Sequence, residues 1–224
     1  MNYSMVKRLI FKDWYLQRWS IIAAIAGGAI TLAIIVTGGK AGFLLGVIGL
    51  VTVLIAVGAQ VAMATTVLER KEQTLPFVMS LPVSYREYTA AKIFAILSIF
   101  LLPWLTLVLG SLAILTLFPE SPRGLVPFVA IMATEILVST CLVIAVAVTS
   151  ESQGWTIGAI MVGNLALNAI GYYVAHIPSI ARGMDGHTVQ WSSAASVLLL
   201  GEFAMAVLLL GLTFLFQARR TDFL

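Results

Sequence analysis

Two acidic side chains, Glu135 and Glu202, interrupt long apolar stretches of the sequence. A charged group at the centre of a bilayer costs about 2.5–3.5 kcal/mol on insertion scales, so such residues usually face a partner or a wet cavity. There a carboxyl could serve as a general acid or base, or could pair with a cationic ligand. The plainer interpretation stays open for both acids, namely a protonated carboxyl that is hydrogen-bonded between helices.

Other polar residues share helix faces with one another in the same stretches. Asn164 and Asn168 are four residues apart, and Tyr172 continues their face, while Ser139 lies one turn after Glu135. At 1.5 Å per residue, Glu135 and Asn164 should lie at similar depth, with Glu202 and Asn168 as a second layer. The candidate substrate path therefore comprises Glu135, Ser139, Asn164, Asn168, Tyr172 and Glu202.

Motifs for common chemistry are missing from the sequence. Gly39-Lys40-Ala41 lacks the other residues of a phosphate-binding loop, and no Gly-x-Ser-x-Gly elbow occurs. The two histidines, His176 and His187, have no acidic partner at metal-ligand spacing, and the single cysteine, Cys141, excludes an intrachain disulfide. We therefore expect no catalytic residue, no metal and no cofactor bound by this chain.

The composition is that of a membrane protein. Of the 224 residues, 60% are hydrophobic and 10% are charged, whereas a soluble domain carries roughly a quarter charged residues. Too few charges remain to cover a soluble surface. The net charge of +3 does not indicate a nucleic-acid partner, because the distribution of the basic residues along the chain follows a membrane topology.

Six stretches are long and apolar enough to cross a hydrocarbon core of about 30 Å. Turn-forming or polar segments, such as Gly38-Gly39-Lys40 and residues 119–124, separate neighbouring stretches. No internal repeat divides the chain, so residues 1–224 are expected to form one all-α transmembrane domain. The predicted spans are Ile21–Thr37, Gly42–Leu68, Ile93–Phe118, Leu125–Thr149, Thr156–Ile177 and Ala194–Phe216.

The basic residues predict the orientation, because cytoplasmic segments are enriched in Lys and Arg. With the N-terminus inside, ten basic residues are cytoplasmic and three, Lys40, Arg123 and Arg182, are outside. Both termini are thus expected in the cytoplasm. Residues 1–19, which mix Lys and Arg with Tyr3, Trp14 and other aromatic residues, are typical of an interfacial helix.

The longest cytoplasmic loop, residues 69–92, contains two helix signals. Ser84 followed by Glu87 is a capping box, which predicts a helix from Ser84 into the third span. Pro76 suits the first turn of a separate short helix over about Leu75–Ser80, and its apolar residues exceed what a solvated loop needs. This helix should dock on a partner, with Phe77 and Met79 in the docking surface. A plain positive-inside anchor with helix caps is the alternative.

The loop resembles the type-2 ABC transporter permeases, the membrane subunits of export-type ABC transporters. The resemblance rests on Glu-Arg, Thr-Leu, Leu-Pro-Val-Ser, Arg-Glu-Tyr and a helix-opening Lys, all within 69–92. It departs from the common pattern at Gln73, Tyr85 and Ala91, and the outer loop Pro178–Ser193 leaves little room for external helices. By position, the resemblance implies a coupling region of Glu69, Thr74, Leu75, Leu81, Pro82, Ser84, Arg86, Tyr88 and Lys92.

The resemblance implies a permease that performs no chemistry itself. Its partners would be two copies of an ABC ATPase, which bind ATP and magnesium, and a second copy of the chain or a related permease. The chain itself would lie in a bacterial cell membrane. The expected function is export of an amphiphilic drug, peptide or lipid-like substrate. Three alternatives stay open, namely a cytochrome-biogenesis permease, an intramembrane enzyme using Glu135 or Glu202, and a regulatory protein that binds an ATPase without transporting anything.

Overall fold

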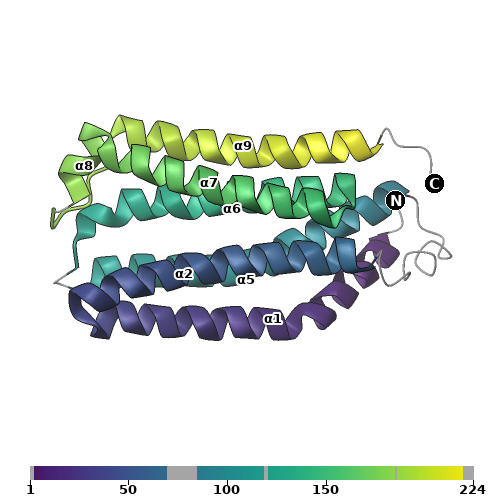
Figure 1. Ribbon diagram of the computed structural model, residues 1–224, viewed down its shortest axis with the longest axis horizontal. Coiled ribbons are helices and arrows are strands. Elements are labelled where there is room, and N and C mark those ends of the chain that lie inside the picture. Colours follow the sequence, from purple (N-terminus) through teal and green to yellow (C-terminus); the bar gives the residue numbers. More distant parts are fainter. Residues whose placement is uncertain (1–2, 70–84, 119–120, 185, 219–224) are drawn as a thin grey trace.

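The computed structural model describes residues 3–69, 85–118, 121–184 and 186–218, and these residues fold into helices without any strand. Six helices are long and apolar enough to cross a membrane, which confirms the predicted number of spans. They run back and forth as a bundle (Figure 1). The long helices are α1 Tyr3–Thr37, α2 Gly39–Ala62, α5 Tyr85–Leu117, α6 Val126–Ser150, α7 Gln153–His176 and α9 Ser193–Ala218.

The bundle consists of two triplets of helices. The closest packing is of α1 with α2 and α5, and of α6 with α7 and α9. These triplets form the lower and upper halves of Figure 1. Across the seam, the Trp104 indole N–H of α5 donates to the Ala133 carbonyl of α6 at 2.9 Å. We call the end where α1 begins and α9 ends the near end, and the opposite one the far end.

Helix α1 is continuous where a boundary was expected. The prediction of a separate interfacial helix over residues 1–19 is not confirmed, because Tyr3–Thr37 form one helix. Neither proline nor glycine lies between Trp19 and Ile25 to end it. Its N-terminal part is angled away from the rest in Figure 1.

The helix that the capping box predicts to continue into the third span is present at the near end. Helix α5 begins at Tyr85 and continues into the third span, and Ser84 itself lies outside the described residues. Helix α2 passes into a π-helical turn, η1 Met63–Leu68, a feature that is rare and often found at functional sites. The predicted short helix Leu75–Ser80 also lies outside the described residues.

The far end contains a helix that we did not expect. The loop after α7 forms α8, Pro178–Met184, because proline suits a helix start and Ile180 is buried against Ile131 and Val174. The Gly124 N–H, in the 3₁₀ turn η2 Arg123–Leu125, donates to the Gly186 carbonyl at 2.9 Å. A side chain on Gly124 would collide with the Gly183 carbonyl oxygen, so this contact requires glycine.

Candidate functional site

A network of four charged side chains lies at the near end, where three helices meet. The Lys92 ammonium group of α5 is 2.9 Å from the Asp13 carboxylate of α1 and 2.7 Å from the Glu69 carboxylate, which follows η1. Lys12 of α1 is 2.6 Å from the other Glu69 oxygen and 3.5 Å from Asp13. Two acids and two bases therefore alternate around one cluster, which we call the charge network.

The charge network is largely shielded from solvent. The side chains of Lys92 and Asp13 are 3% and 2% exposed, that of Glu69 is 12% exposed, and only Lys12 is substantially open at 38%. Removing a charge from water costs several kcal/mol, which close pairing in good geometry offsets. Such a network is stable as a complete set, and the loss of one member leaves a buried charge unpaired.

Apolar packing holds the helices that carry the charge network. Val6 and Leu9 of α1 are buried against Ala91 and the half-buried Tyr88 of α5. Leu9 and Asp13 are four residues apart, so one face of α1 provides both the apolar contact and the carboxylate. The Trp14 indole N–H donates to the Ser98 hydroxyl at 2.9 Å and fixes the same helix pair six residues beyond Lys92 on α5.

The charge network joins Glu69 and Lys92, the two ends of the loop of residues 69–92, to α1. Glu69 is the last described residue before the loop, and Lys92 lies about 10 Å into α5 from Tyr85 at 1.5 Å per residue. A displacement of the loop would therefore reach α1, the end of α2 and α5 through these contacts. This arrangement is suited to passing a displacement from one of these helices to another.

The structure brings together some of the predicted coupling residues. Glu69 and Lys92 are in direct contact, and Tyr88 lies one turn before Lys92, whose ammonium group is 5.7 Å from the Tyr88 ring centre. Arg86 lies in the first turn of α5, and its side chain is outside the description. The remaining predicted residues also lie outside the described residues, namely Thr74, Leu75, Phe77, Met79, Leu81, Pro82 and Ser84.

Sequence analysis did not single out Lys12 and Asp13 as site residues. A signal was present, because Asp13 is the only acid before Glu69 and stands in a basic, aromatic segment. An isolated acid of this kind indicates a buried cationic partner, since solvated acids in such a segment would weaken its attraction to a membrane surface.

The candidate path residues separate into two groups. Glu135 of α6 is 4% exposed, and Glu202 lies on α9, which packs against α6. Ser139 packs against α7 at Gly163, where a side chain would collide with the Ser139 hydroxyl. One Glu202 carboxylate oxygen is buried and has no hydrogen-bond partner among the described residues. This first group, formed by Glu135, Ser139 and Glu202, lies on α6 and α9.

The second group is a polar stripe on α7, formed by Asn164, Asn168, Tyr172 and His176. The Asn164 and Asn168 amides donate to the carbonyls one turn earlier, at 3.0 and 2.8 Å. Tyr172 is 62% exposed and its ring lies 4.2 Å from that of His176. Both amides thus bond along α7, and the similar depths of Glu135 with Asn164 and of Glu202 with Asn168 stay a prediction.

No cluster of three or more potential metal ligands occurs among the residues that the structure describes. Comparisons with protein-family models, with curated proteins and with solved structures find no match to this chain.

Proposed function

We propose that this protein is the membrane subunit of an ATP-driven exporter of the type-2 ABC class, driven by a separate ATPase. The observation that carries the proposal is the charge network, in which Glu69 and Lys92, at the two ends of one loop, pair with each other and Lys92 also pairs with Asp13. The resemblance of residues 69–92 to the coupling region of that class supports the same assignment.

The loop acts as the coupling element. In this proposal, the short helix that the sequence predicts around Leu75–Ser80 docks into a cleft of the ATPase, with Phe77 and Met79 in the contact. ATP and magnesium bind to the ATPase, whose closure displaces the loop. The charge network passes this displacement to α1, α2 and α5, and the bundle changes from inward-open to outward-open.

The polar stripe on α7 supports a path between two chains. Asn168 and Tyr172 are exposed in this chain, and lipid cannot hydrogen-bond to an amide or a hydroxyl. A second copy or a related permease supplies the other wall, so that twelve spans surround the path. Glu135, Ser139 and Glu202 lie behind this wall and adjust its polarity toward amphiphilic substrates such as drugs, peptides or lipids.

The near end faces the cytoplasm of a bacterial cell. Lys7, Arg8 and Arg18 line the start of α1, where they attract anionic headgroups. Arg18 lies 4.1 Å from the Tyr15 ring centre, and this pair is suited to the headgroup region. The angled N-terminal part of α1 therefore lies along the inner surface of the membrane.

An intramembrane enzyme is the second candidate, favoured by the two acidic side chains, Glu135 and Glu202, within the apolar helices α6 and α9. One experiment separates the two. The chain is reconstituted in vesicles alone and together with an ABC-type ATPase that co-purifies with it. A permease moves substrate only with the ATPase and ATP, whereas chemical turnover of a substrate by the chain alone would contradict the transport proposal.

A further inference from the structure

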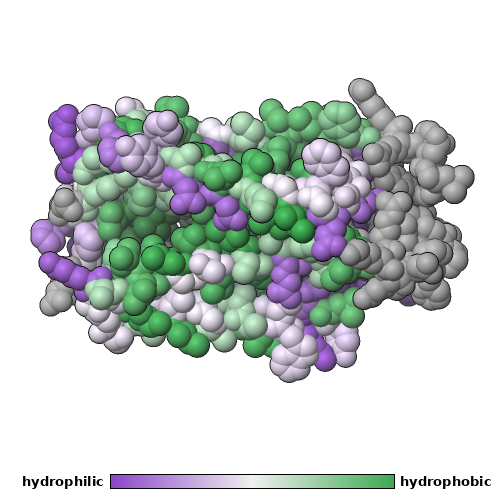
Figure 2. Space-filling model, in the orientation of Figure 1, coloured by the Kyte–Doolittle hydropathy of each residue, from purple (hydrophilic) through white to green (hydrophobic). Residues whose placement is uncertain are grey.

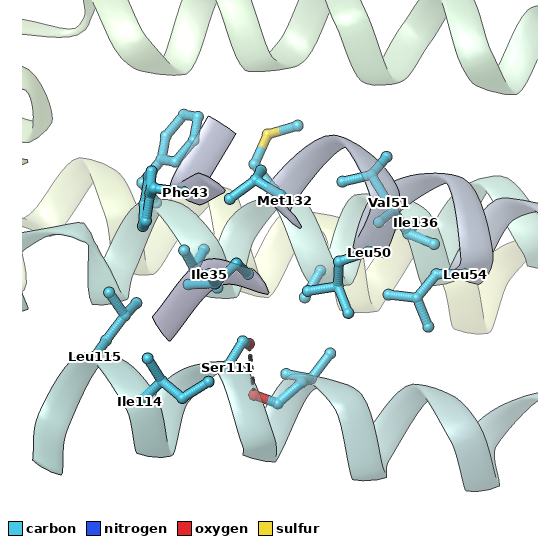
Figure 3. A pocket seen from close by; sticks show the side chains of 15 residues that line it. Ile35, Phe43, Leu50, Val51, Leu54, Ser111, Ile114, Leu115, Met132 and Ile136 are labelled. Atoms are coloured by element: carbon cyan, nitrogen blue, oxygen red, sulfur yellow. Dashed lines mark hydrogen bonds between the residues drawn. The ribbon is translucent and has the colours of Figure 1, made fainter. Parts of the chain in front are cut away.

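An apolar slot enters the bundle at the seam between the two triplets, in the half nearer the far end (Figure 3). Its volume is about 170 Å³, and α1, α2, α5 and α6 all contribute to its wall. Figure 2 shows this part of the surface as hollowed and hydrophobic. Phe43, Leu50 and Leu54 of α2 face Met132 and Ile136 of α6 across it.

Water has no partner in the slot. Ser111 is the polar side chain among the described lining residues, and its hydroxyl donates to the Val108 carbonyl at 2.8 Å. A cavity of about 150 Å³ with apolar walls stays dry and takes up small hydrocarbons. The slot is therefore suited to hydrocarbon.

The length of the slot matches one leaflet of a membrane. Phe43 and Leu54 are separated by about 16 Å along α2 at 1.5 Å per residue. Half of a hydrocarbon core of about 30 Å is of the same length. An acyl chain that enters from the far end would thus be covered over most of its depth.

A polar mouth adjoins the slot at the far end. A second cavity of about 540 Å³ shares Ile35, Phe43 and Ile114 with the slot and is bordered by Lys40 and Ser121. Lys40 is the second residue of α2, so its ammonium group and the positive end of the helix dipole occupy the same place. Both favour an anionic group such as a phosphate.

We propose that the slot holds one acyl chain of a phospholipid from the leaflet at the far end, with the lipid phosphate at Lys40. The apolar walls, the leaflet-deep length and the cationic mouth are the three parts of such a site. The inference needs only the six membrane spans and is independent of the transport proposal.

Substitution inside the slot tests the proposal. The chain is extracted from vesicles of phosphatidylethanolamine and phosphatidylglycerol, and the phospholipid retained per chain is counted by native mass spectrometry. Val51→Phe fills the slot, whereas Ile48→Phe on the same helix adds the same ring at a 55% exposed position outside the lining. We expect one lipid on the parent and on Ile48→Phe. The lipid retained by Val51→Phe should fall at least about tenfold. Excluding two methylenes of the acyl chain from the slot costs about 1.6 kcal/mol, which is already a factor of about ten in affinity.

Two further variants complete the test. Lys40→Glu, which leaves the packing intact, should lower phospholipid retention but not retention of an uncharged diacylglycerol. Met132→Phe fills the slot from α6 and replaces Val51→Phe if the latter does not fold. Equal retention by the parent and a folded slot-filled variant, or its loss in Ile48→Phe, would overturn the proposal. A second copy of the chain cross-linked into the slot at Val47 would do the same.

Discussion

At the scale of single residues, Lys92 has the most constrained environment of the described cations. Its side chain is 3% exposed, and its ammonium group lies within 3 Å of carboxylates from two other segments. Removing one partner of a buried ion pair is far more costly than replacing the whole set by apolar groups, because an unpaired charge stays behind. The charge network should therefore respond to substitution as a unit.

Lys92→Met should lower the free energy of unfolding by about 3–5 kcal/mol, the cost of leaving buried carboxylates unpaired. The double variant Asp13→Asn with Lys92→Met should be less destabilised than the sum of the two single variants, as expected for coupled neighbours. Chemical unfolding in detergent, followed by circular dichroism, measures both.

Lys40→Met is the matched control, because Lys40 is exposed. It should change the free energy of unfolding by less than about 0.5 kcal/mol. Strict additivity of Asp13→Asn and Lys92→Met would show that the two side chains are not coupled and would remove the charge network as a mechanical unit.

At the scale of elements, α7 presents two exposed faces of different character. The polar stripe carries Asn168, whereas Val162, which is 56% exposed, lies on an apolar face about 120° away at 100° per residue. Asn168 is eight residues from the far end of α7, and Val162 is nine residues from its near end. Each residue therefore lies at a similar depth below the membrane face nearer to it. A path lined by α7 should hydrate the first position and leave the second in lipid.

In a Cys141→Ala background, Asn168→Cys should react with a charged thiol reagent at least about tenfold faster than Val162→Cys, because the reacting thiolate forms only where water is present. Labelling rates in membrane vesicles measure this. Similar slow rates at both positions would indicate that the stripe is covered by protein or faces lipid, and would remove it from the path.

At the scale of the whole molecule, the even number of spans places both ends of the described chain at the near end (Figure 1). Impermeant thiol reagents added to intact cells test which side this is. Cysteines at Ser121 and Ser192, at the far end, should react, while those at Ser84 and Ser152 should not. Outside labelling at Ser152 would invert the orientation, and the loop could then not meet a cytoplasmic ATPase.

The sequence was sufficient for the spans and insufficient for their contacts. Apolar length alone predicts six helices, and the Ser84 capping box predicts the start of α5. Partners across helices depend on the rotation and crossing of helices that a single helical pattern does not encode. For this reason the bond between Asp13 and Lys92, 79 residues apart, and the bond from Trp104 to the Ala133 carbonyl were not predicted.

Two local features, the short helix α8 and the continuity of α1, also differ from what the sequence predicts. Helix α8 has seven residues and depends on the burial of Ile180 in contacts from three other segments. The continuity of α1 past residue 19 follows from the absence of a helix breaker. The basic and aromatic composition of residues 1–19 is typical of an interfacial helix, but composition alone does not end a helix.

The most direct test of the proposed role uses an ABC-type ATPase that co-purifies with the chain, and measures its affinity for variants with a charge in the loop. Phe77→Asp should weaken binding at least about tenfold, since burying an unpaired charge costs more than 1.4 kcal/mol. Phe77→Leu should bind like the parent, and all three proteins should insert equally well. Equal affinity of Phe77→Asp and the parent would contradict coupling through this loop.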